Sequence, residues 1–170
     1  MACYLDLFEY DNELDTLLET LDVDCRLGIA LSCVKRVVHL SKPYDPQEIV
    51  PRYVNGFNAY MKAILEKRKI IELEISKIEH VANQHYEAIY DEKYSGLHSD
   101  QIPNSIENQL NKASQARYAA ASARHVYLSQ IWNVAEEAHT CYPSAISLAW
   151  AATLGAVSYT HLTLPTKRIV

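Results

Sequence analysis

Glycine and proline are scarce in this chain, with four glycines and six prolines among 170 residues. So few turn-forming residues favour long helices over a β fold that needs many turns. The glycines also stand alone, so the chain has no glycine-rich loop of the kind that cradles phosphate groups. GxSxG, HExxH and CxxC motifs are all absent. The sequence therefore lacks the common signatures of serine hydrolases, zinc proteases and thioredoxin-like proteins.

Basic residues are missing from the first 24 positions, which hold eight acids. A secretory signal begins with basic residues and continues into a long apolar run, so none is predicted here. The four cysteines lack paired spacings, and a reduced, cytoplasmic setting is the expectation. The longest apolar stretch, 145–157, is too short to cross a bilayer, so no membrane association is expected.

What the chain does contain is a helical pattern with enough apolar residues for a packed core. Hydrophobic residues make up 49% of the sequence and charged residues 22%. Long helices with short connections predict an all-α fold, an antiparallel bundle of about six helices in one domain over residues 1–156. The predicted helices cover the first 24 residues, then 25–41 capped by Asp24, 46–67 capped by Asp45 and kinked or restarted at Pro51, and 70–94. They continue with 105–140, as one helix or as two broken in the Ala/Ser-rich middle, and end with a last helix from Ala145 after Pro143.

The end of the chain breaks this pattern. Residues 157–166 read VSYTHLTLPT, which is Thr-rich and strand-like after an Ala-rich helix. Back-translated, these ten codons resemble the transposase adapter used to build sequencing libraries, and Ala156 and Lys167 fit the flanking bases. The resemblance implies that residues 157–170 are not native and that the natural protein is truncated inside its last helix. Without Lys167 and Arg168 the remaining chain has 14 bases and 21 acids, a net charge of −7.

One pair of residues suggests metal chemistry. Glu136 and His139 are three apart on a predicted helix, the spacing that di-iron bundles use for two of their ligands. Such centres need a second pair of this kind and two more inward carboxylates, which the sequence does not supply. We therefore expect no metal site, no cofactor and no catalytic residues, and a metal-binding bundle enzyme remains the alternative.

Two surface features suggest a protein partner. The acidic N-terminal helix would attract a basic partner and speed its association, whereas the same acidity disfavours nucleic acid. A row of tyrosines at i, i+4 and i+8 would offer aromatic anchors on another helix. The candidate contact residues are Asp11, Asp15 and Glu19 on the acidic helix, and Tyr86, Tyr90 and Tyr94 in the aromatic row.

Three stretches together carry a family resemblance. They are ALSCVKRVVHLSKPYDPQEIVPRY at 30–53, with Arg36 and the Pro51-Arg52 pair, KASQARYAAASARHVYLSQIW at 112–132, and AISLAWAATLGA at 145–156. In pattern and composition they resemble the small all-α immunity proteins of bacterial polymorphic-toxin systems. Lys35 departs from the acid found before the arginine in some members. The resemblance implies a bacterial protein that binds and blocks one cognate toxin and has no enzymatic activity of its own. A non-catalytic phage or mobile-element protein is a third possibility.

Overall fold

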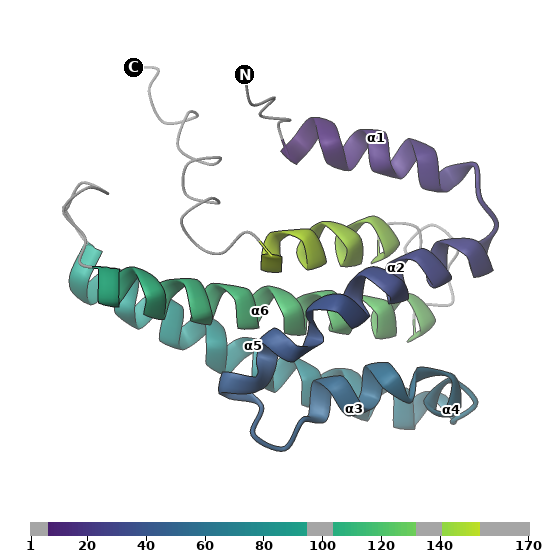
Figure 1. The fold of residues 1–170 in the computed structure, drawn as a ribbon. Helices are drawn as coiled ribbons and strands as arrows, with labels where there is room; N and C mark the ends of the chain where they lie inside the picture. The colour runs from purple at the N-terminus through teal and green to yellow at the C-terminus, as the bar shows by residue number, and fades with distance from the viewer. Residues whose placement is uncertain (1–6, 95–103, 132–140, 154–170) are drawn as a thin grey trace.

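The computed structural model describes residues 7–94, 104–131 and 141–153, and these residues form helices joined by short turns (Figure 1). No strand occurs in these three ranges, which confirms the all-α bundle. The elements are α1 (Leu7–Glu19), α2 (Val23–Val37), the 3-10 helix η1 (Val38–Tyr44), α3 (Ile49–Asn55), α4 (Phe57–Met61), α5 (Leu65–Tyr94), α6 (Asn104–Ile131) and a further helix over 141–153.

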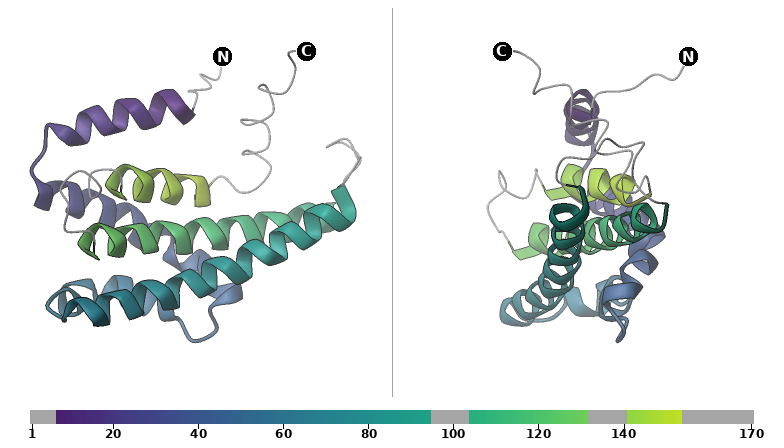
Figure 2. Two further views of the ribbon diagram at one scale, coloured as in Figure 1. Left: turned by 180° about the vertical axis from the view of Figure 1, so that it is seen from behind. Right: turned by 90° about the vertical axis from the view of Figure 1, so that its left-hand side faces the viewer.

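The body of the molecule is the antiparallel hairpin of α5 and α6, which run side by side in every view (Figures 1 and 2). One face of α5 is apolar and buried. Its buried residues are Ile71, Ile75, Ile78, Ala82 and Ile89. Their spacing of three, four and seven residues keeps them on one side of the helix, where they meet α6.

Helix α6 is covered on almost every side. Its alanines at 113, 116, 119, 120 and 123 are fully buried, and Ser114 and Ser122 are buried among them. Small side chains let neighbouring backbones approach closely, so α2, η1 and helix 141–153 can pack around the same helix that pairs with α5. The Ala-rich composition of this segment therefore follows from its central position in the fold.

The connection between α2 and α3 differs in detail from the sequence prediction. Asp22, not Asp24, caps α2, because Asp22 Oδ1 accepts the Cys25 backbone N–H at 2.8 Å. Asp45 does serve α3, but from outside the capping position. Its two carboxylate oxygens accept the N–H groups of Ile49 and Val50 at 2.8 and 2.7 Å. The capping position itself is Glu48, whose φ of 52° is left-handed, so Pro46 lies outside the helix.

Three helix boundaries are also corrected. The segment predicted as 46–67 is split at Gly56, where an added Cβ would lie 2.7 Å from the Tyr60 ring. Helix α5 begins at Leu65 rather than at 70. The last helix begins at 141 rather than 145, and Pro143 lies in its first turn, where no N–H is needed for the helical ladder. The predicted helix of 105–140 is described as far as Ile131.

The main buried cluster joins residues from all these helices, and two smaller clusters lie beside it. The main cluster runs from Leu18 in α1, through Val34, Val54, Ile75 and Val126, to Ile146 in helix 141–153. The single domain stays a prediction, and both its boundary at Ala156 and the segment 157–170 lie outside the described residues. None of the described helices is long and apolar enough to span a membrane.

Candidate protein-interaction surface

Helix α1 lies along one edge of the bundle and is joined to α2 by a tight turn (Figure 1). Leu14, Leu18 and Leu21 turn inward and pack on the core. Arg26 of α2 secures the turn, since its Nε donates to Leu21 O and its Nη2 to Glu19 O, both at 2.9 Å. Arg26 is only 8% exposed, and its positive charge lies at the C-terminal end of α1, where it complements the helix dipole. The two hydrogen bonds of Arg26 therefore hold the end of α1, with its acidic residues, in place against α2.

The turn and its flanking helices form the surface that we name the acidic corner. Its acids are all exposed, and three large apolar side chains are exposed between them. Leu17 is 62% exposed, Val23 58% and Ile29 41%. All three are carried by the turn or by the two helices that it joins, and exposed apolar side chains gathered in one region can mark a site of interaction. The acidic corner comprises Glu13, Glu19, Asp22, Asp24, Leu17, Val23 and Ile29.

A shallow open groove of about 430 Å³ continues from this corner along α2. Its lining includes Leu21 and Cys25 nearest the corner, then Gly28 and Ser32, and Arg36 further along α2. Gly28 has no side chain and that of Ser32 is small, which leaves room for an inserted apolar group. The hydrogen bond with Asp22 raises the pKa of Cys25 and disfavours its thiolate form.

The structure separates the predicted contact residues into two surfaces. Glu19 is exposed in the acidic corner, Asp15 is half-buried on α1, and the side chain of Asp11 lies outside the described set. The tyrosines occupy the C-terminal half of α5, which lies apart from α1 in both orientations of Figure 2. The acidic helix and the aromatic row therefore do not form one continuous patch.

Within the aromatic row, Tyr86 takes part in internal packing. The Arg117 guanidinium lies 4.0 Å from the centre of its ring, and Arg117 also donates to Asn83 Oδ1 at 2.8 Å. Burial raises the pKa of Tyr86. Tyr90 stacks on Tyr86 with ring centres 6.0 Å apart and keeps 40% of its surface exposed. Tyr94 belongs to α5, but its side chain is not described. Of these rings, Tyr90 is the one placed to meet a partner.

A second polar cluster crosses the hairpin beside these residues. Arg124 of α6 forms an ion pair with Glu79 at 2.7 Å and lies 3.6 Å from Glu72, with all three side chains mostly buried. Burial raises the pKa of Glu79, and the Arg124 charge opposes that shift. Carboxyl groups with a shifted pKa occur in active sites. Here the ion pairs join α5 to α6, so we assign the cluster a structural role.

The metal hypothesis receives no support from the described residues. No group of three His, Cys, Asp or Glu side chains in those ranges is arranged to hold an ion. Glu136 and His139 fall in the segment 132–140, outside the described residues. The pairing that the sequence suggested for them stays a prediction.

The exposed apolar residues of the acidic corner were missed by sequence reasoning. Leu17 and Leu18 are neighbours in the sequence, but one residue on a helix is a rotation of about 100°, so the two side chains point in different directions. The buried positions Leu14, Leu18 and Leu21 are spaced four and three apart, and Leu17 falls off that line. The signal was therefore present in the spacing.

Comparisons with protein-family models, with curated proteins and with solved structures found no match to this chain.

Proposed function

We propose that this chain is a protein-binding module of the immunity type, which neutralises a cognate bacterial toxin through the acidic corner. The observation that carries the proposal is the exposure of Leu17, Val23 and Ile29 among surface acids. Protein interfaces combine an apolar centre with a charged rim. A basic cleft carrying one or two apolar side chains is the partner that fits this surface.

The arrangement of the acids supports fast and selective association. Glu13, Glu19 and Asp24 are exposed on α1 and at the start of α2, so their charges can act on a partner before contact. The backbone N–H of Cys25 holds the pKa of Asp22 below its usual range, so this carboxyl keeps its charge at neutral pH. Mutual attraction would steer a basic partner, and the apolar side chains would then slow its release.

Tyr90 belongs to this proposal only as a second contact. Its ring is presented on α5, away from α1, so one partner would touch both surfaces only by spanning the bundle. We assign the primary contact to the acidic corner and expect a Tyr90→Ala change to weaken binding less than changes at Leu17 or Glu19.

The test starts with the neighbouring gene, which should encode a large secreted protein with a C-terminal toxin domain. Co-expression of that domain with this chain should restore growth, and the purified pair should form a one-to-one complex. The double variant Leu17→Ser, Glu19→Lys should lose protection, because it removes one exposed apolar group and reverses one exposed charge.

A matched control variant is Val81→Ser with Asp91→Lys. Both residues are exposed on α5, and the changes alter the net charge by the same amount and likewise remove one exposed apolar side chain. This control should protect as well as the original chain. The proposal fails if no toxin domain is encoded beside the gene, or if both double variants protect equally well.

A further inference from the structure

A second surface of the molecule has the opposite charge. The segment 62–69 holds four basic residues and one acid, in a chain whose net charge is −5. Arg68 turns inward and donates to Ala63 O at 3.0 Å and to Gln130 O at 3.2 Å. The lysines stay at the surface. We name this surface the basic corner and define it by Lys62, Ile64, Leu65, Glu66, Lys67, Lys69 and Ile70, which are all exposed. Glu66 forms an ion pair with Lys69 at 3.3 Å, and the three lysines still leave the corner with a net positive charge.

The basic corner also exposes large apolar side chains. Ile64, in the turn between α4 and α5, is 75% exposed, and Leu65, Ile70 and Leu73 follow it on α5 at 41%, 57% and 54%. Apolar side chains that project into water beside lysines have the same construction as the acidic corner, with the charge inverted. The molecule thus carries both halves of a complementary contact.

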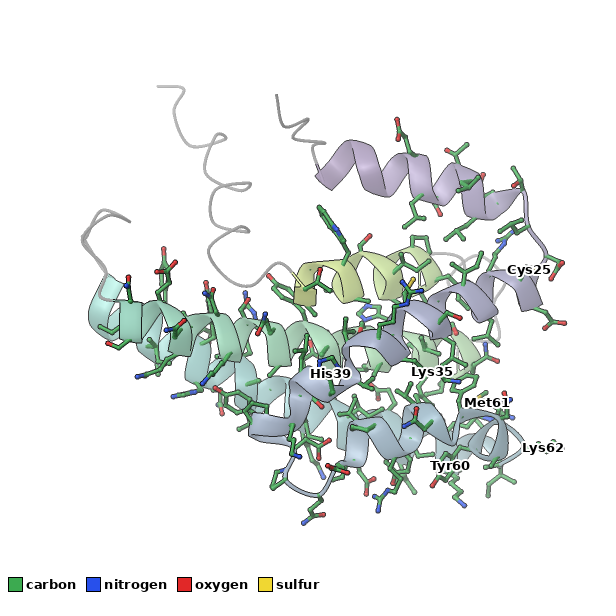
Figure 3. The ribbon with its side chains drawn as sticks, in the orientation of Figure 1. Cys25, Lys35, His39, Tyr60, Met61 and Lys62 are labelled. Carbon is green, nitrogen blue, oxygen red and sulfur yellow. The ribbon has the colours of Figure 1, made fainter. Side chains whose placement is uncertain are left out.

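The two corners lie at the same end of the molecule. Figure 3 labels Cys25 beside the turn between α1 and α2, and Lys62 beside the turn between α4 and α5, and both stand at the right-hand end. The reversed view agrees, since both turns then lie on the left (Figure 2). A two-fold rotation can therefore bring two copies together end to end, with the acidic corner of each copy against the basic corner of the other. Such symmetric pairs are the commonest oligomers.

We propose that this end of the molecule is a pairing surface for a second copy of the chain. Each pair makes the acid-to-base contact twice, and the apolar groups Leu17, Val23, Ile64 and Ile70 are withdrawn from water together. Single-charge contacts in water are weak, but two clusters with apolar centres add area to the attraction. Pairing should weaken as salt rises, because exposed charges are screened.

This pairing goes beyond the proposed toxin binding and needs no toxin. The two activities share the acidic corner, so a bound toxin would displace the second copy. Pairing is measured on the isolated chain and protection on the co-expressed toxin. The failure of one proposal therefore leaves the other to be judged by its own experiment.

The decisive experiment mixes two charge-reversed variants and follows their mass by sedimentation velocity. The first carries Glu19→Lys and Asp24→Lys, and the second carries Lys62→Glu and Lys67→Glu. Each alone places like charges in contact, so its dissociation constant should rise by about tenfold or more. Mixed in equal amounts, the two variants should form a one-to-one dimer, since every contact is again between opposite charges.

A matched control carries Asp91→Lys and Lys112→Glu, both exposed and outside the two corners, and it should pair like the original chain. The proposal is overturned if the original chain is monomeric at every concentration, if the mixed variants stay monomeric, or if open chains form in place of dimers. Where a reversal unfolds the protein, as far-UV circular dichroism would show, the neutral variants Glu19→Gln with Asp24→Asn replace it. These should also weaken pairing, and unchanged pairing would contradict the proposal.

Discussion

Arg26 is the residue on which the position of the acidic helix depends. Its guanidinium is almost fully buried and binds two carbonyl groups at the end of α1, Glu19 O and Leu21 O. Replacing it by methionine keeps the apolar length of the side chain but leaves those carbonyls without these donors. Arg26→Met should therefore lower the free energy of unfolding by about 1–3 kcal/mol. Urea denaturation followed by circular dichroism measures this loss.

The control for that experiment is Arg26→Lys. Lysine retains the charge but lacks the planar fork that meets two carbonyls together, so its effect should fall between those of arginine and methionine. Hydrogen exchange should also show faster exchange in α1 than in α6 for the methionine variant. An unchanged urea midpoint for Arg26→Met would contradict the role given to Arg26.

His125 makes the stability of the fold depend on pH. Burial lowers its pKa below the ordinary value of 6.5, and its Nδ1 lies 2.8 Å from Ala121 O, as a donor in the neutral ring. The unfolded chain therefore binds this proton more readily than the folded chain. The stabilising effect is complete above pH 6.5 and is lost as the pH falls through that value towards the folded pKa. One proton gives a limiting slope of about 1.4 kcal/mol per pH unit.

The variant His125→Gln separates this effect from that of other titrating groups. Its free energy of unfolding should fall less steeply between about pH 7 and pH 5 than that of the original chain. Urea midpoints at matched pH values give both curves. Parallel curves would show that His125 titrates alike in both states, contrary to the structure.

At the residue scale, the sequence identified the charges of the candidate site better than its apolar part. Glu19 was expected on an acidic outer face, and it is exposed there. The exposure of Leu17 and Val23 was not predicted, because exposure of an apolar side chain depends on which face of the helix meets the core. The internal packing of Tyr86 was not predicted either. Its contact with Arg117 joins residues 31 positions apart, so no local sequence pattern indicates it.

At the scale of elements, the alanines of α6 allow the surrounding helices to pack closely against it. Ala120 is fully buried in the main core cluster, at the centre of the helix. A leucine there adds three carbon atoms to a space that holds one methyl group. Ala120→Leu should destabilise the protein by about 1–3 kcal/mol through overpacking. Lys112→Leu on the exposed side of the same helix should change stability by less than about 0.5 kcal/mol.

Thermal or urea unfolding of the two variants tests this directly. If both substitutions had equal effects, α6 would not have the enclosed position described here. A loss confined to Ala120→Leu would confirm that small residues at this position allow the surrounding helices to approach.

The sequence predicted the helices themselves more accurately than their ends. Periodic apolar residues predicted α2 and α5, because the helical period repeats in every turn. The ends depend on single contacts that periodicity does not report. Asp45 reaches past Glu48 to cap α3, and Gly56 separates α3 from α4 because the Tyr60 ring occupies the space beside it.

For the whole molecule, the positions of the charged residues are more informative than the net charge. The net charge of −5 averages an acidic corner against a basic one at the same end of the bundle. Composition alone gave the correct impression of an acidic protein but concealed the lysines of the second corner. Folding brings the two segments, about 40 residues apart in sequence, to one end, and this placement is what the pairing proposal depends on.

The common core predicts that the molecule unfolds as one unit, the N-terminal helix included. Leu18 of α1 is 3% exposed and belongs to the same cluster as Ile146 near the end of the described chain. Leu18→Ala should therefore shift the entire urea transition, at a cost of about 2–5 kcal/mol. Leu17→Ala, one residue away and exposed, should stay within about 0.5 kcal/mol of the original chain. Far-UV circular dichroism and tyrosine fluorescence should give coincident curves for each variant. An early partial transition in Leu18→Ala, with the main midpoint unchanged, would instead make α1 a separate unit, and the acidic corner would then depend on the turn at Arg26 alone.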